Sequence, residues 1–217
     1  FKAINPLFPQ RRGDVMLLIN GMPVFHIELK QSNCCLSEAY NQIEKYSKEG
    51  IFSHGIFSLV QIFIAMKPDD VVYFANQGFE DKKINHSFMF HWENTDNEVI
   101  TNWDEFVEKF LYIPMAHQLI GYYTIPDNKD KTLKIVRSYQ YYAISKIIKI
   151  VENNNWTSGE QRGGYIWHTT GSGKTLTSFK AADLIAKNKY ADKVIFLVDR
   201  IQLDIQSLDT YKNLSES

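Results

Sequence analysis

Hydrophobic residues recur along the chain at two different spacings, which divides it into strand-like and helix-like segments. Runs rich in β-branched and aromatic residues predict strands at 15–19, 24–30, 56–66 and 71–75, with a further candidate at 88–92. Apolar positions at helical spacing predict helices at 38–48, 103–111, 137–151 and 176–187. Short apolar runs at 164–167 and 194–198 are typical of buried strands. The order of these elements predicts an α/β protein.

The dipeptide Asn20-Gly21 lies between the first two predicted strands and is a strong hairpin signal. A strict two-residue loop would pair Asp14 with Ile27. A three-residue loop, residues 20–22, would instead pair Asp14 with Glu28, with their Cβ atoms about 5 Å apart. We expect the three-residue loop, with Asn20 or Gly21 at positive φ.

Polar and turn-forming residues cluster at 125–132, which makes this segment the best candidate for a linker. The strand, loop, helix and strand between residues 164 and 198 predict a right-handed βαβ unit of a parallel sheet. We therefore expect two domains, 1–130 and 131–217.

Residues 168–175 (HTTGSGKT) join an apolar segment to a helix, which is the context of a phosphate-binding loop. Backbone N–H groups of such a loop surround a phosphate, and the helix N-terminus adds partial positive charge. His168 stands where the general pattern has glycine. We expect Lys174 to reach the β- and γ-phosphates of ATP and the Thr175 hydroxyl to bind Mg²⁺. The expected nucleotide-binding residues of the loop are Thr170, Gly171, Ser172, Gly173, Lys174 and Thr175.

A second chemical site is predicted in the N-terminal part, where Glu28 and Lys30 share one face of a strand. Two carboxylates as close as Asp14 and Glu28 repel unless a cation lies between them, and oxygen ligands suit Mg²⁺. Lys30 would then orient a water or neutralise charge in the transition state. Gln42 and Tyr46, four residues apart on a helix, could contact a phosphate or brace the metal ligands. The alternative for the Asp…Glu-x-Lys pattern by itself is a surface hairpin with a cluster of charges.

Composition narrows these possibilities further. The net charge of −1 gives no overall basic field, so any DNA binding must use local patches. No apolar run is long enough to span a membrane and no signal peptide opens the chain. The adjacent Cys34 and Cys35 are interpreted as reduced thiols of a cytosolic protein. Because the first residue is Phe1, we expect the chain to be a fragment.

Four segments together resemble the restriction (motor and endonuclease) subunit of type I restriction-modification enzymes. They are residues 11–30, 42–46, 137–143 and 196–206. Residues 11–30 are similar to a PD-(D/E)xK nuclease core, with Gly13 where the pattern often has proline, and residues 42–46 are similar to the QxxxY helix of the RecB-like branch. Residues 137–143 resemble the segment before the first motor motif of superfamily 2 helicases, where Gln140 would read adenine with Arg137 nearby. Residues 196–206 are similar to the motif that follows the phosphate loop.

The resemblance implies an N-terminal fragment with two parts: a RecB-like nuclease domain on a mixed sheet, and the start of a RecA-like lobe on a parallel sheet. Asp14 and Glu28 would bind Mg²⁺, Lys30 would be the catalytic lysine, and Gln42 and Tyr46 would support them. The family acts in the cytoplasm on double-stranded DNA, with modification and specificity subunits, and couples cleavage to ATP-driven translocation.

Two departures from the family pattern remain. The acidic residue that such nucleases often supply further upstream is absent, so the nuclease domain is expected to be incomplete at its N-terminus. No Walker B box follows residue 198, so this fragment by itself is expected to lack ATPase activity. The competing functions are a helicase-type ATPase whose N-terminal domain only binds DNA, and a nucleotide-binding regulatory module. The roles of His26 and of Asp199-Arg200 are left open.

Overall fold

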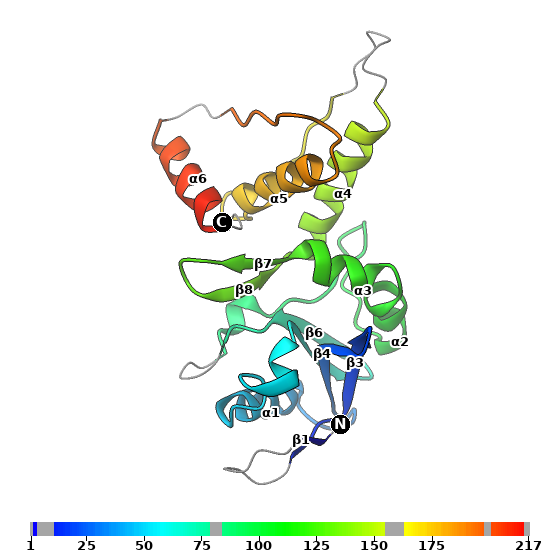
Figure 1. Cartoon of the computed structure of the whole chain (residues 1–217). Helices are drawn as coiled ribbons and strands as arrows, with labels where there is room; N and C mark the ends of the chain where they lie inside the picture. The colour runs from blue at the N-terminus through cyan, green and yellow to red at the C-terminus, as the bar shows by residue number, and fades with distance from the viewer. Residues whose placement is uncertain (1, 4–10, 79–83, 155–162, 198–200, 215–217) are drawn as a thin grey trace. The chain divides into compact units, whose positions relative to one another are not determined.

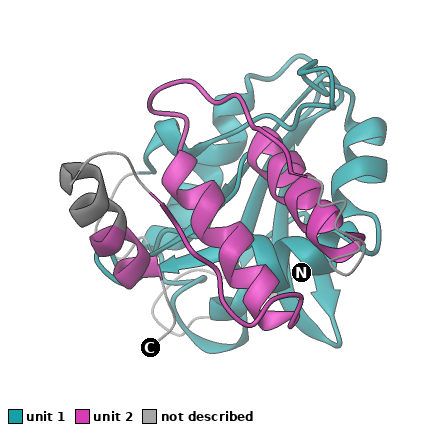
Figure 2. Ribbon diagram, turned by 90° about the horizontal axis from the view of Figure 1, so that it is seen from above, with its two compact units in different colours: residues 1–137 teal, residues 138–217 magenta. Residues whose placement is uncertain are grey.

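The computed structural model describes residues 2–3, 11–78, 84–154, 163–197 and 201–214 (Figure 1). The chain forms two compact units, residues 1–137 and residues 138–217 (Figure 2). Asp199 and Arg200 lie outside the described residues. None of the helices that the structure describes is long and apolar enough to cross a bilayer.

The first unit is built on a mixed four-stranded sheet in the order β3-β4-β5-β6. Its strands are β3 (Val15–Ile19), β4 (Met22–Leu29), β5 (Ile62–Lys67) and β6 (Asp70–Ala75). The central pair, β4 and β5, is parallel, and the other neighbours are antiparallel. The predicted strand at 56–66 is wrong in its first part, because the 3-10 helix η1 (Gly55–Leu59) precedes β5.

The hairpin of β3 and β4 reaches the expected register by an unexpected route. Ile19 pairs with Met22 across a two-residue turn in which Asn20 and Gly21 both have positive φ, at 51° and 81°. A β-bulge then shifts the ladder by one residue, so that Val15 pairs with Ile27. The three-residue loop was therefore wrong, and the bulge supplies the residue that the longer loop was expected to supply.

Both faces of this sheet are buried, each by different helices. Helix α1 (Leu36–Lys48) packs on the face that carries Phe63 and Phe74. On the other face, Tyr73 packs against Trp92 and Phe110. The helical segments that follow β6 in the first unit are η2 (His86–Phe88), α2 (Trp103–Phe106), η3 (Val107–Leu111), α3 (Met115–Gln118) and η4 (Leu119–Tyr123). The face that carries Glu28, expected to form a polar site, is thus also a core face, and its polar residues lie at one end of β4.

The linker expected at 125–132 is instead a second hairpin. Strands β7 (Thr124–Asp127) and β8 (Thr132–Ile135) pair with each other, and the Asp127 carboxylate accepts the N–H groups of Lys129 and Asp130 within the turn. Aspartate forms such turns readily, which explains why turn residues imitated a linker. The two units divide after Arg137. Two further short strands, β1 (Lys2–Ala3) and β2 (Arg11–Arg12), pair with each other.

The second unit contains the expected helices but not the expected sheet. The expected helices are α4 (Ser138–Glu152) and α5 (Lys174–Lys187), and a further helix, α6 (Ile201–Leu214), was not predicted. The segments 164–167 and 194–197, predicted as buried parallel strands, form no strand in the described part of this unit. Tyr165 and Leu197 are about 90% exposed. A parallel strand requires hydrogen-bonding neighbours and cover on both faces, and the described residues of the unit supply neither to these segments.

Candidate functional site

The expected nuclease residues lie at one end of β4, under helix α1. Glu28 is fully buried because its side chain lies on the face of the sheet that α1 covers. One of its carboxylate oxygens, Oε1, accepts a hydrogen bond from Lys30 Nζ at 3.1 Å. The other, Oε2, makes no hydrogen bond among the described residues, although it lies 3.3 Å from His26 Nε2. A buried carboxylate oxygen left without a donor is costly, and such a group is often explained by an ion.

Asp14 approaches the same place from the neighbouring strand. The ladder between β3 and β4 ends at the Val15–Ile27 pair, and Asp14 and Glu28 are the next residues along the chain on either side of it. The Asp14 Oδ2 atom accepts the N–H of Leu29 at 2.8 Å, which fixes its carboxylate against the end of β4. Burial raises the pKa of the Tyr46 hydroxyl, and the charges of Glu28 and Asp14 raise it further. Both carboxylates therefore act on one hydroxyl, and Tyr46 stays a neutral donor.

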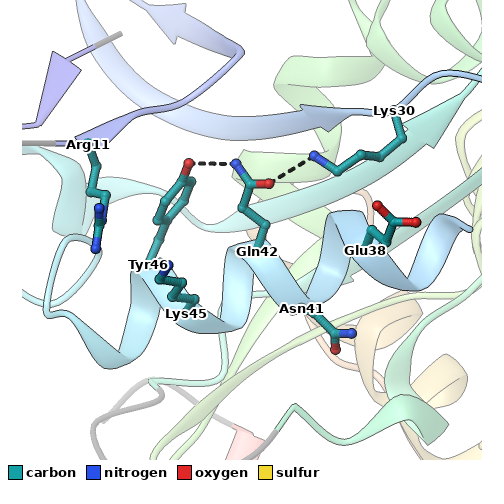
Figure 3. A pocket seen from close by; sticks show the side chains of 7 residues that line it. All are labelled: Arg11, Lys30, Glu38, Asn41, Gln42, Lys45 and Tyr46. Atoms are coloured by element: carbon teal, nitrogen blue, oxygen red, sulfur yellow. Dashed lines mark hydrogen bonds between the residues drawn. The ribbon is translucent and has the colours of Figure 1, made fainter. Parts of the chain in front are cut away.

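A chain of hydrogen bonds joins α1 to Lys30, which follows β4, and to Arg12 of β2; Figure 3 shows its first two bonds. Lys30 Nζ donates to Gln42 Oε1 at 2.9 Å, and Gln42 Nε2 donates to the Tyr46 hydroxyl at 2.6 Å. The Tyr46 hydroxyl in turn donates to the carbonyl of Arg12 at 2.9 Å. Because Arg12 precedes Gly13 and Asp14, Tyr46 holds the backbone that presents Asp14. Of the two roles expected for Gln42 and Tyr46, the contacts favour bracing.

His26 lies on β4, two residues before Glu28. It is fully buried, and its ring packs near those of Phe52 and Phe63. Its Nε2 atom is 3.3 Å from Glu28 Oε2. His26 is thus a core histidine in contact with a site carboxylate.

The carboxylates suit a divalent cation in number and kind. Mg²⁺ usually binds one or two protein carboxylates and keeps several waters, and Asp14 and Glu28 meet that need. The orphaned Glu28 oxygen is the structural observation that fits such an ion. Across the described residues, no cluster of three or more His, Cys, Asp or Glu side chains forms a larger metal site.

An open pocket of about 670 Å³ lies beside Lys30 (Figure 3). It is lined by Arg11, Lys30, Glu38, Asn41, Gln42, Lys45 and Tyr46. Arg11 is held by a two-pronged ion pair with Glu49, and both N–O distances are 2.6 Å. The sequence motifs did not point to Arg11, Asn41 or Lys45 as pocket residues, although Asn41 and Lys45 lie on the same predicted helix as Gln42 and Tyr46.

The phosphate-binding loop of the second unit has the expected backbone form. Gly171 and Gly173 have φ values of 78° and 80°, and α5 begins at Lys174. The positive φ of Gly173 favours glycine, and a Cβ atom there would also displace the end of the Gln140 side chain, whose Nε2 would lie 2.6 Å away. Lys174 Nζ donates to the loop's own carbonyl of Thr169 at 2.8 Å. The Lys174 ammonium, which is expected to bind phosphate, therefore binds a carbonyl of the phosphate-binding loop in this structure.

Helix α4 supports this loop from behind. The Tyr139 hydroxyl donates to the carbonyl of Ser172 at 2.7 Å, and its ring meets the edge of His168. Gln140 is buried, and its amide donates to the carbonyls of Ser172 and Gly173 at 3.4 Å. Burial, with the nearby Lys174 charge, lowers the pKa of His168, which keeps this ring neutral beside the loop.

The remaining predicted nucleotide residues lie as follows. Thr170 is exposed in the loop, and Thr175 is half-buried in the first turn of α5. Arg137 belongs to the first unit, where its guanidinium lies 4.6 Å from the centre of the Phe90 ring. Adenine binding by Gln140 and Arg137 stays a prediction.

Known families match both parts of the chain. Residues 8–82 match the family described as type I restriction enzyme R protein N terminus, and residues 139–217 match the SWI2/SNF2 ATPase family. The chain is 39% identical over 206 residues to the type I restriction enzyme SsaAORF53P endonuclease subunit of Staphylococcus saprophyticus, covering 94% of this chain and 21% of that protein. The chain belongs to the family of type I restriction enzyme endonuclease subunits.

Other members of the family are similar over the same extent. The SauCOLORF180P endonuclease subunit of Staphylococcus aureus (strain COL) is 37% identical over 206 residues, 94% of this chain and 21% of its own length. The putative MjaVIIP endonuclease subunit of Methanocaldococcus jannaschii is 30% identical over 217 residues, 94% of this chain and 20% of its own. The chain thus spans about a fifth of the length of these endonuclease subunits.

Replacing Tyr139 by phenylalanine tests the support of the loop. The change removes one hydrogen bond to Ser172, worth about 0.5–1.5 kcal/mol, so affinity for ATP should fall roughly 2- to 13-fold. Titration of the full-length endonuclease subunit with a fluorescent ATP analogue measures the change. Tyr142→Phe on the same helix is the matched control. Equal affinity in the two variants would contradict the supporting role of Tyr139.

Proposed function

We propose that this chain carries the nuclease domain and the first part of the motor of a type I restriction endonuclease subunit. The nuclease would have a PD-(D/E)xK fold and cut double-stranded DNA with Mg²⁺, and the motor would be RecA-like and use ATP to translocate DNA. The observation that carries the proposal is the meeting of Asp14, Glu28 and Lys30 at the end of β4, braced by Gln42 and Tyr46.

The residues at the end of β4 would have different roles in phosphodiester hydrolysis. A Mg²⁺ ion held by Asp14 and Glu28 would polarise the phosphodiester and lower the pKa of an attacking water. Lys30, fixed by Glu28 and Gln42, presents a positive charge where negative charge develops on the phosphoryl oxygens. Tyr46 holds the backbone before Asp14 and so preserves the spacing of the two carboxylates.

The second site would hold the phosphates of ATP. Backbone N–H groups at Gly171 to Gly173 and the N-terminus of α5 present donors to an anion. Lys174 would leave its contact with Thr169 for the β- and γ-phosphates, and Thr175 would bind the accompanying Mg²⁺. Gln140, with Arg137, would recognise adenine.

In the whole protein these activities would serve defence against foreign DNA in the cytoplasm, within a complex that also holds modification and specificity subunits. The support is family membership and the SWI2/SNF2 ATPase match over residues 139–217. Cleavage would then depend on ATP, because one chain would carry both sites.

The full-length subunit, assembled with its partner subunits, provides the test. Asp14→Asn should lower double-strand cleavage of a circular plasmid about 100-fold or more while ATP hydrolysis continues. Asp69→Asn, in the turn between β5 and β6, is the matched control for loss of one acid. If the Asp14 variant cuts at the wild-type rate, the first unit only binds DNA and the chain is a helicase-type ATPase with a non-catalytic domain.

A further inference from the structure

Helix α1 contributes two pairs of polar residues to the lining of the pocket beside Lys30. Gln42 and Tyr46 form the inner row and are occupied with Lys30 and the backbone of Arg12. Asn41 and Lys45 form the outer row, one residue earlier along the helix and also four residues apart. Both outer residues are exposed and line the same pocket (Figure 3).

The outer row offers donor groups that form no hydrogen bond among the described residues. Within the described part of the chain, neither the Asn41 nor the Lys45 side chain makes a hydrogen bond or ion pair. The other cations of the lining are engaged, Arg11 by Glu49 and Lys30 by Glu28. Glu38, the acid of the lining, accepts the N–H of Cys35 at the start of α1. Among the described residues, the Lys45 ammonium is therefore the cation of the pocket that forms no ion pair within 4 Å, although its charge helps to lower the pKa of the Glu49 carboxyl, and it lies next to an amide donor.

The size and position of the pocket suit a polyanion that passes the site. A volume of about 670 Å³ exceeds what a single phosphate needs. Four residues on a helix span about 6 Å, so Lys45 and Asn41 offer donors along a short path parallel to Gln42 and Tyr46. A nucleic acid strand with one phosphate at Lys30 would pass along the lining that Lys30 shares with Asn41 and Lys45.

We propose that Asn41 and Lys45 form a second phosphate subsite, which binds the phosphodiester next to the one that is cleaved. The ligand class is the backbone of DNA, bound through its charge and not through its bases. This subsite rests on the proposed nuclease function, because it is defined relative to Lys30. It explains why an exposed asparagine and lysine flank Gln42 and Tyr46 without contacts of their own.

The experiment uses the full-length subunit, assembled with its partners for cleavage and by itself for binding. Lys45→Gln should slow plasmid cleavage about 3- to 10-fold at unchanged ATP hydrolysis. For a short duplex without a recognition site, bound in Ca²⁺ and followed by fluorescence anisotropy, the slope of log affinity against log salt should become shallower by about 1. Lys45→Arg should keep both values. Lys48→Gln, whose lysine pairs with Glu44 outside the pocket, is the control.

The outcomes separate this inference from the function on which it rests. Wild-type cleavage and salt slope in Lys45→Gln, with Glu28→Gln inactive, would overturn the subsite and leave the nuclease assignment intact. Cleavage by Glu28→Gln would overturn both. Loss of assembly with the partner subunits in Lys45→Gln, at an unchanged salt slope, would show that the surface binds protein and would also overturn the subsite.

Discussion

Glu28→Gln is expected to lower the rate of DNA cleavage about 100-fold or more, while ATP hydrolysis by the assembled enzyme continues. Glutamine keeps the shape of the buried side chain and an oxygen that can accept from Lys30. It removes the negative charge that a cation needs and replaces the orphaned oxygen with an amide group. Loss of cleavage without loss of folding would therefore report on charge.

Two further measurements sharpen this result. Binding of Mn²⁺ to the nucleotide-free full-length subunit, measured by calorimetry, should weaken in Glu28→Gln, because one of the two carboxylates is lost. Glu28→Ala should also lower the melting temperature, because it leaves a cavity beside His26 and Lys30 without its buried partner. Cleavage within a few-fold of wild type in the glutamine variant would refute Glu28 as a metal ligand.

Lys174→Ala is expected to abolish ATP hydrolysis and, with it, cleavage by an intact nuclease site. The Lys174 ammonium donates to the carbonyls of His168 and Thr169. We expect it to donate to the phosphates when ATP is bound. A hydrogen bond between charged groups is worth about 1.5–3 kcal/mol, so affinity for ATP should fall roughly 10- to 150-fold. Nucleotide titration and phosphate release on the full-length subunit measure the two effects.

The matched control for Lys174 lies at the other end of the same helix. Lys187 forms an ion pair with Asp183 near the C-terminus of α5, so Lys187→Ala should leave nucleotide binding unchanged. Sustained ATP hydrolysis by Lys174→Ala would remove the assigned role. Comparing Glu28→Gln with Lys174→Ala also tests whether cleavage depends on ATP hydrolysis, because only Lys174→Ala should lose both activities.

The hairpin shows what the sequence could and could not predict about the site. The residues were predicted, and the register that brings Asp14 toward Glu28 was expected, but the route to it was wrong. Pro23 was an available signal, because proline cannot donate to the ladder and often marks a bulge. The burial of Glu28 was not predictable from β4, since it depends on α1 packing over that face.

Longer-range features were harder to predict. The turn residues at 125–132 have the same composition in a linker and in a tight hairpin, and only the pairing of β7 with β8 distinguishes them. Helices α4 and α5 were predicted correctly, because their signal is local. The strands expected at 164–167 and 194–198 depend on neighbours distant in sequence, and a continuous apolar run does not say whether those neighbours are present.

Those two apolar segments also govern how this chain behaves in solution. Tyr165, Trp167, Ile195 and Leu197 expose about nine-tenths of their surface. Extended apolar segments without strand partners pair readily with similar segments of other molecules. Self-association through these segments should therefore limit the concentration at which this polypeptide stays in solution. Polar substitutions at these four positions would raise that limit without touching Asp14, Glu28 or Lys174.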